Sequence, residues 1–303
     1  MKIGLIGVGE LGKAIAANML KAGHTLFLYD ARPEQAHSIL AQGALWCESV
    51  LALASSVDVL LTALPNPAIV EAVMTGPEGA LAGLQPGTCW IDHSTNDGQL
   101  LQRLAAEASL KDVDVIEAPV TGGIPLAHAG QITVLVGGEK AVVAAKRLLL
   151  EIVGNPVIHL GPVGSASIVK VMTNMLAFIH LWALGEGLML CKEAGLDVGA
   201  TFEAIKASCG NSFVAETEGP PILNGSYDYG FTLELAAKDM RLVHQIARQH
   251  GVPLEMGGLA DQILTRAMRR YGGKFWSTGV VKMLEDDLHS DLRAPGYEPE
   301  ARW

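Results

Sequence analysis

The first twenty residues read as a strand, a glycine-rich turn and a helix. An apolar run from Lys2 to Ile6 leads into Gly7-Val8-Gly9-Glu10-Leu11-Gly12, and a helical pattern continues to Leu20. In this context the first glycine permits a tight turn, the second lets a pyrophosphate approach the backbone, and the third lets helix and strand pack closely. The alternative is a turn that only connects two elements. The pattern predicts a dinucleotide-binding α/β domain, with Gly7, Gly9, Leu11 and Gly12 as candidate cofactor contacts.

An acidic residue follows the next expected strand. That strand runs from His24 to Tyr29 and leads into Asp30, at about the distance past the turn where a carboxylate accepts hydrogen bonds from the adenosine ribose. A carboxylate there would repel the 2′-phosphate of NADP, so Asp30 favours NAD. Arg32 keeps NADP open, because its guanidinium could cover a phosphate; the alternative is a solvated turn residue before Pro33.

Strands and helices alternate as far as about residue 161. Buried strands are expected at Val57–Leu64, Thr88–Asp92, Val113–Ala118 and 130–138. This alternation predicts a mostly parallel, doubly wound sheet with right-handed crossovers, the Rossmann arrangement. Ligands bind such sheets at the carboxyl ends of the strands, so polar residues at those ends are candidates for a site.

Two of the strand ends carry suitable groups. His93-Ser94-Thr95-Asn96 offers hydroxyls and an amide that fit the nicotinamide end or the substrate; the alternative is a helix N-cap. Thr121-Gly122-Gly123 follows another strand, and its glycines leave backbone N–H groups uncovered that can cradle a carboxylate.

A long apolar segment begins near Ser165 and is expected to form one buried helix over about 165–193. It holds Lys170, and Asn174 lies one turn later on the same face. Because burial depresses the pKa of an ammonium, a lysine here fits a proton carrier in a wet cavity; the alternative is a lysine whose stem covers core while its tip reaches water. Strand patterns stop here, which predicts a dinucleotide-binding domain over 1–161 and an all-α domain over 162–303 joined by this helix.

Charge and cysteine usage exclude several functions. The formal net charge is -10, whereas nucleic acids and anionic membrane surfaces are bound by basic proteins, so neither partner is expected. The polar residues of the long segment argue against a membrane span. The cysteines show neither metal-ligand spacing nor a disulfide framework: Cys47, Cys89, Cys191 and Cys209. No metal site is expected, and without a secretory signal pattern the expected location is the cytoplasm.

Together these residues resemble the β-hydroxyacid dehydrogenase family, which includes 3-hydroxyisobutyrate dehydrogenases, tartronate semialdehyde reductases and glyoxylate/succinic semialdehyde reductases. The resemblance covers nearly the whole chain. Its carriers are the turn 7–12, Thr62-Ala63-Leu64-Pro65, Asp92-His93-Ser94-Thr95, Ala118-Pro119-Val120-Thr121-Gly122-Gly123, Lys170 with Asn174, and Lys238-Asp239. It implies a second domain like the helical domain of 6-phosphogluconate dehydrogenase.

The resemblance also implies a role for each candidate residue. Lys170 would carry the proton, Asn174 would position the substrate, and Thr121, Gly122 and Gly123 would bind its carboxylate. Leu64, Pro65 and Thr95 would touch the cofactor, with Lys238 near the nicotinamide. The implied reaction moves hydride between NAD(H) and a small anionic β-hydroxy acid or its semialdehyde or keto acid. A homodimer or homotetramer through the helical domain is expected as well.

Some positions depart from the family. Thr121 stands where serine is usual, and Leu126 and Gln131 replace a common glycine and threonine. Phe275-Trp276-Ser277-Thr278 replaces Asp-x-Ser-Ala, which changes either the pocket or only a helix start. The substrate acid is therefore left open. Two other functions are alternatives: an NADPH-dependent imine reductase, against which the retained Lys170 argues, and a non-catalytic dinucleotide sensor.

Overall fold

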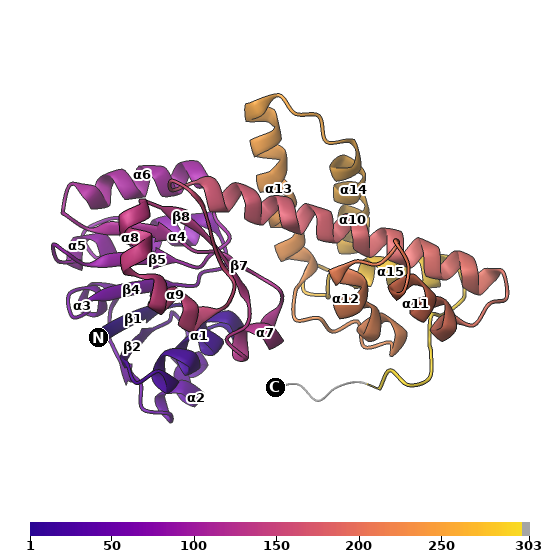
Figure 1. Cartoon of the computed structure of the whole chain (residues 1–303), viewed down its shortest axis with the longest axis horizontal. Coiled ribbons are helices and arrows are strands. Elements are labelled where there is room, and N and C mark those ends of the chain that lie inside the picture. Colours follow the sequence, from indigo (N-terminus) through magenta and orange to yellow (C-terminus); the bar gives the residue numbers. More distant parts are fainter. Residues whose placement is uncertain (299–303) are drawn as a thin grey trace. The chain divides into compact units, whose positions relative to one another are not determined.

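The computed structural model describes residues 1–298, which fall into two compact units. Unit 1 spans Met1–Lys170 and unit 2 begins at Val171. Residues 162–170, placed in the second domain by the sequence pattern, lie in unit 1 because their backbone is bonded to it. The Gln102 side chain donates to the Val163 carbonyl at 3.0 Å, and the Glu117 carboxylate accepts from the Gly164 N–H at 2.7 Å. Figure 1 shows unit 1 in indigo to magenta and most of unit 2 in orange and yellow.

Unit 1 is built on one sheet in the order β3-β2-β1-β4-β5-β6-β8-β7, with β9 paired to β8. The pairs from β3 to β6 and the pair β8–β9 are parallel, whereas β6–β8 and β7–β8 are antiparallel. The prediction of a mostly parallel, doubly wound sheet is confirmed. The strands are β1 (Lys2–Ile6), β2 (Thr25–Tyr29), β3 (Leu45–Trp46), β4 (Val59–Thr62), β5 (Cys89–Asp92), β6 (Asp114–Glu117), β7 (Val120–Thr121), β8 (Thr133–Gly138) and β9 (Val157–Gly161).

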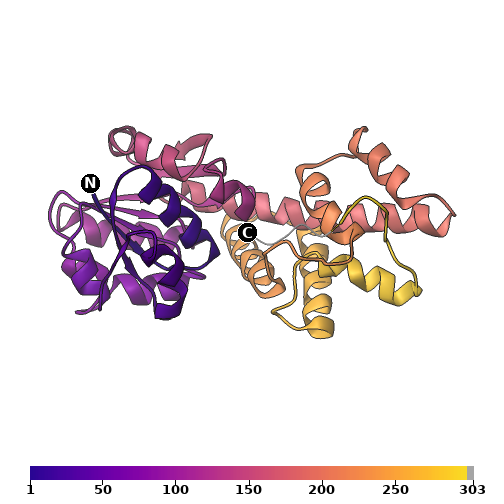
Figure 2. The same ribbon diagram turned by 90° about the horizontal axis from the view of Figure 1, so that it is seen from below.

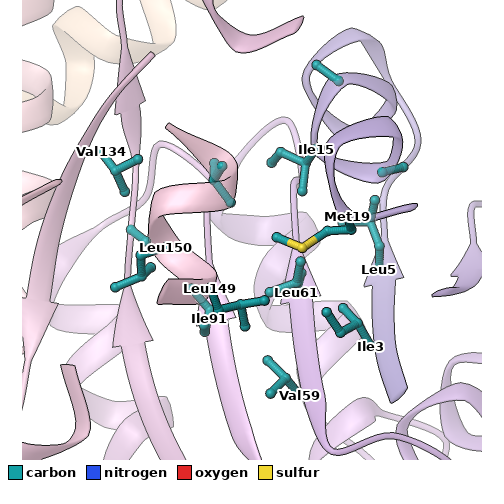
Figure 3. Close-up of a cluster of buried hydrophobic side chains, with 14 of the residues drawn as sticks. Ile3, Leu5, Ile15, Met19, Val59, Leu61, Ile91, Val134, Leu149 and Leu150 are labelled. Carbon is teal, nitrogen blue, oxygen red and sulfur yellow. The ribbon is translucent and has the colours of Figure 1, made fainter. Parts of the chain in front are cut away.

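Helices cover both faces of this sheet, because successive strand residues point to opposite faces. Ile3 and Leu5 join a core with α1 (Glu10–Lys21), whereas Leu60 joins a second core on the other face. Figure 3 shows the first core, where Met19 of α1 and Leu149 of α9 lie near Leu61 of β4. The other helices of unit 1 are η1 (Pro33–Ala36), α2 (His37–Leu40), α3 (Val50–Ala54), α4 (Pro67–Met74), α5 (Ala80–Gly83), α6 (Gly98–Ser109), α7 (Ile124–His128), α8 (Lys140–Ala145) and α9 (Arg147–Val153).

A single continuous helix, α10 (Ser165–Glu193), starts in unit 1 and supplies the first helix of unit 2. Its Leu188 shares a core with Phe202 and Met240 from later helices. The predicted all-α part led by a helix near 165–193 is confirmed, and Figure 2 shows these helices from below. They are α11 (Val198–Lys206), α12 (Phe213–Leu223), α13 (Leu233–His250), α14 (Glu255–Tyr271) and α15 (Gly279–Leu288).

By length and apolar composition, α10 is the one helix of the described chain that could cross a membrane. The core helix of a soluble protein has the same character. Val171, Leu181 and Leu188 of α10 are fully or almost fully buried in the core of unit 2. One side of α10 therefore lies in the core of unit 2, while 39% of its most apolar 18-residue window is buried overall.

Candidate active site

The glycine turn between β1 and α1 leaves room for a ligand at the start of the helix. Gly7 has a φ of +97°, and a Cβ at Gly7 or at Gly12 would overlap the backbone of Ala63 or of Gly7. These two glycines let strand and helix approach closely. At Gly9 the φ is −70°, and a Cβ there would meet no atom within 4 Å. The space beside Gly9 and the positive end of α1 together suit a pyrophosphate, while Leu11 packs partly buried against the core.

Asp30 follows β2 and is bonded directly to the glycine turn. Its Oδ2 accepts a hydrogen bond from the Val8 N–H at 2.7 Å, and its Oδ1 accepts one from the Arg32 N–H at 2.9 Å. Each oxygen keeps a second lone pair that can accept from a ribose hydroxyl. The side chain of Arg32 is exposed at the surface. The structure therefore brings Asp30 to the turn, with Arg32 beside it.

A buried carboxyl organises the segment after β5. Asp92, the last residue of that strand, is fully buried and accepts hydrogen bonds from the Thr62 hydroxyl at 2.7 Å and the Asn96 amide at 2.9 Å. Burial raises the pKa of the Asp92 carboxyl, and the hydrogen bonds that it accepts act in the opposite direction. Although Asp92 is part of a recognised motif, its pairing with Thr62 of the neighbouring strand follows only from the sheet order.

The loops after β1, β4 and β5 meet at one edge of the sheet. The Leu64 N–H donates to the Ser94 hydroxyl at 2.9 Å, and the Leu64 side chain lies against Gly7. Leu64 and Thr95 are half-buried and Pro65 is exposed. Three of the predicted cofactor contacts thus share the carboxyl edge with the glycine turn, as the sheet topology requires.

His93 lies next to this edge and is an uncharged, buried imidazole. Its ring Nδ1 is 2.8 Å from the Ala118 carbonyl oxygen, and since a carbonyl only accepts, Nδ1 carries the proton. Desolvation lowers the pKa of His93 to about 4, although the bond to Ala118 acts against this shift. Within residues 1–298 its Nε2 has no hydrogen-bond partner. The imidazole therefore stays neutral at physiological pH.

The Thr121-Gly122-Gly123 turn joins β7 to α7. Thr121 pairs with Thr133 of β8, and the next two residues have φ values of +131° and +92°. Side chains avoid these conformations, so the turn itself requires glycine at both positions. The turn is half-buried, and its backbone N–H groups follow directly after a hydroxyl. Such a set of donors fits a carboxylate.

Lys170 lies in the second turn of α10, with only 8% of its surface exposed. Lysine is among the residues least often buried, because an ammonium loses hydration there. Lys170 is also the last residue of unit 1, the unit that holds the glycine turn and the Thr121-Gly122-Gly123 turn. Its burial is what distinguishes it from an ordinary helix-surface lysine.

Asn174 is anchored by a buried aspartate in unit 2. Its amide donates to Asp239 Oδ2 at 2.5 Å, and Asp239 Oδ1 lies 3.0 Å from Lys238 Nζ. Asp239 is 1% exposed. The structure thus links Asn174 and Lys238, two predicted site residues, through the Asp239 carboxylate, for which the sequence pattern predicts no role. An acidic residue next to Lys238 was the available signal, but its pairing with Asn174 spans 65 residues.

The segment 275–278, which replaces an acidic motif of the family, is part of the core of unit 2. The Leu233 N–H donates to the Phe275 carbonyl, and the Ser277 N–H donates to the Phe231 carbonyl. The Thr278 hydroxyl is buried and donates to the Tyr227 carbonyl. Within unit 2 these contacts hold the start of α15.

Metal ligands do not gather anywhere in residues 1–298: no three His, Cys, Asp or Glu side chains lie close enough to hold an ion. All four cysteines are free thiols.

Two protein families match the chain. The NAD binding domain of 6-phosphogluconate dehydrogenase matches residues 2–161, and the family described as NAD-binding of NADP-dependent 3-hydroxyisobutyrate dehydrogenase matches residues 164–284. Together they cover unit 1 and most of unit 2.

Characterised relatives match over nearly their full length. The chain is 34% identical to 2-(hydroxymethyl)glutarate dehydrogenase of Eubacterium barkeri, over 94% of this chain and 95% of that protein. It is 31% identical to L-threonate dehydrogenase of Cupriavidus necator, over 93% of this chain and 95% of that protein.

The similar solved structures include a hydroxyacid dehydrogenase and, at lower similarity, an imine reductase. 3-Hydroxyisobutyrate dehydrogenase of Mycobacterium tuberculosis, with L-serine, is similar with a TM-score of 0.84 and 26% identity, over 93% of this chain and 98% of that one. An imine reductase of Streptomyces aurantiacus is more distant, with a TM-score of 0.60 and 18% identity, over 94% and 99%.

Proposed function

Since this chain belongs to the β-hydroxyacid dehydrogenase family, we propose that Lys170 carries the proton as it oxidises a small β-hydroxy acid or reduces the corresponding semialdehyde or keto acid. The chain is an NAD(P)-dependent oxidoreductase of that family. The observation that carries the proposal is the burial of Lys170 in the unit that also holds the glycine turn.

The residues of unit 1 fit a nicotinamide dinucleotide. The open space at Gly9 and the N-terminus of α1 would hold its pyrophosphate, and the Asp30 carboxylate would accept from its adenosine ribose. Leu64, Pro65 and Thr95 would contact it further along the sheet edge. The cofactor supplies the hydride acceptor or donor. Asp30 favours NAD, and NADP is the alternative because Arg32 lies beside it.

The protein groups provide binding, orientation and proton transfer. The Lys170 amine accepts the proton of the substrate hydroxyl during oxidation and returns it during reduction. Backbone N–H groups of Gly122 and Gly123, with the Thr121 hydroxyl, hold the substrate carboxylate. The family resemblance assigns Asn174, whose amide donates to Asp239, to positioning the reacting end of the substrate, and Lys238 to the surroundings of the nicotinamide.

The known relatives support the substrate class without fixing the acid. The relatives are named as dehydrogenases of 2-(hydroxymethyl)glutarate, L-threonate and 3-hydroxyisobutyrate. Each of these three compounds carries a hydroxyl near a carboxylate. Imine reduction is less favoured, because the imine reductase structures are more distant and Lys170 is present. We also propose a cytoplasmic homodimer or homotetramer assembled through unit 2, with neither nucleic acid nor membrane as a partner.

The experiment is a substrate panel. The purified chain is incubated with NAD+ or NADP+ and short β-hydroxy acids, or with NADH or NADPH and semialdehydes or cyclic imines, and the absorbance of the reduced nicotinamide is followed. Turnover of at least one hydroxy acid, lost in Lys170→Ala, is the expected result. Reduction of imines alone, or cofactor binding without turnover of any substrate, would overturn the proposal in favour of the reductase or the sensor.

A further inference from the structure

One buried carboxylate holds the whole start of α10. Glu117, the last residue of β6, has no exposed surface. Its Oε1 accepts from the Gly164 N–H and the Ala166 N–H, both at 2.7 Å; its Oε2 accepts from the Ser167 N–H at 3.1 Å and from the Ser167 hydroxyl at 2.5 Å. Three of these donors are backbone groups that a helix start leaves without partners, and a negative charge there is favoured by the helix dipole.

This arrangement is costly, so it calls for a reason beyond capping. Burial raises the pKa of Glu117, and the four hydrogen bonds act against that shift. A serine or aspartate at the N-cap satisfies a helix start without burying a charge in a sheet. Elsewhere in unit 1, Ser49 caps α3 and Asp97 caps α6 in this way. A glutamate can also cap a helix while exposed: Glu139 caps α8 by accepting from the Ala141 and Val142 N–H groups.

The sheet is shaped to admit this side chain. Gly137 of β8 is paired with Glu117, and a Cβ at Gly137 would overlap Glu117 Oε1. The segment before the helix is also bound by α6, because the Gln102 side chain donates to the Val163 carbonyl at 3.0 Å. The position of α10 is thereby fixed against both a strand and α6.

The two ends of this link, Glu117 and Ser167, each lie a few residues from a part of the candidate site in unit 1. Lys170 follows Ser167 by three residues, and Thr121 follows Glu117 by four. We propose that Glu117 is a positioning residue: it fixes the rotation and height of α10 so that the Lys170 amine is held in register with the Thr121-Gly122-Gly123 turn. This rests on the proposed function. A slip of one residue would move Lys170 by about 1.5 Å along the axis, and a misplacement of about 1 Å can lower a rate on the order of 10²-fold.

The test compares Glu117→Gln with the matched cap variant Glu139→Gln in the full-length protein with its best hydroxy acid. Glu117→Gln is expected to lower kcat about 10- to 100-fold, because the amide cannot accept from all four donors at the start of α10. The Kd for NAD should stay within about twofold. Glu139→Gln should leave kcat unchanged. A folded Glu117→Gln protein with wild-type kcat would overturn the proposal.

Two further variants separate positioning from loss of fold. Ser167→Ala removes one of the four hydrogen bonds and should lower kcat a few-fold, and Ser167→Thr, which keeps the hydroxyl, should restore it; equal rates in all three proteins would contradict the proposal, even if Glu117→Gln does not fold. In a Lys170→Ala background, Glu117→Gln should cause no further loss, because both act through one group. Full activity of Lys170→Ala itself would instead remove the proposed function.

Discussion

The Asp30 carboxylate accepts a hydrogen bond from the Val8 N–H at 2.7 Å, although the two residues lie 22 positions apart. This bond connects the end of β2 to the glycine turn, so one side chain orders the turn and faces the expected ribose site. Binding of the cofactor and the conformation of the turn are therefore coupled through Asp30.

Asp30→Asn should weaken NAD binding about tenfold or more, because hydrogen bonds to a charged acceptor contribute roughly 1.5–3 kcal/mol. It should also reduce the preference for NAD over NADP, since the repulsion of the 2′-phosphate is lost. Titration of both cofactors by fluorescence measures this. Asp58→Asn is the control, because Asp58 accepts from the Lys2 N–H at 2.8 Å at the other end of β1; equal losses in the two variants would contradict the assignment.

Gly9→Ala and Gly12→Ala should affect different properties: the first should weaken NAD binding and the second should lower stability. A Cβ at Gly9 enters open space, so the fold should remain stable while NAD binding falls at least about tenfold, because the pyrophosphate can no longer approach. A Cβ at Gly12 overlaps the Gly7 carbonyl oxygen and should lower the free energy of unfolding by about 1–3 kcal/mol. Urea unfolding and NAD titration of both variants separate the effects, and normal NAD affinity in Gly9→Ala would exclude the phosphate site.

Local motifs were predictable, whereas long-range bonds were not. The glycine turn, Asp30 and the Thr121-Gly122-Gly123 turn were found because each lies at a strand end, and topology alone places strand ends together. The bond of Glu117 to Ser167 spans 50 residues, and that of Asn174 to Asp239 spans 65. Neither has a spacing rule, since both depend on how α10 packs. The predicted domain boundary at 161/162 follows the end of the strand pattern, whereas the compact units divide after Lys170, beyond the residues that Glu117 binds.

His93 should make stability depend on pH. Its pKa is about 4 in the folded chain against 6.5 for a free imidazole, so the unfolded state binds the extra proton as pH falls from 6.5 toward 4. The contribution of His93 to the free energy of unfolding is therefore fully present above pH 6.5. It is lost as the pH falls from 6.5 toward 4, by up to about 3 kcal/mol in total.

His93→Asn tests this, because its amide can still donate to the Ala118 carbonyl and does not titrate. Chemical denaturation of both proteins at several pH values should show a shallower acid loss in the variant. Parallel pH profiles for the wild type and His93→Asn would show that His93 is not the responsible group.

Asp239→Asn should affect both stability and turnover. The NH2 group of the new amide would face either the Asn174 amide NH2 or the Lys238 ammonium. Both of these are donors, so a buried polar group is left without a good partner. The free energy of unfolding should fall by about 1–3 kcal/mol. Because Asn174 then loses its anchor, kcat/KM for the hydroxy acid should fall about tenfold or more while the Kd for NAD is retained. A stability loss with unchanged kcat/KM would assign Asp239 to structure alone.

The most direct measurement is the kcat of Lys170→Ala with saturating NAD+ and hydroxy acid, taken together with its Kd for NAD. Loss of a general acid or base predicts a decrease of about 10²-fold or more with the Kd within about twofold, because the cofactor is bound by the glycine turn and Asp30. A kcat within a few-fold of the wild type in a folded, cofactor-binding Lys170→Ala protein would contradict the account.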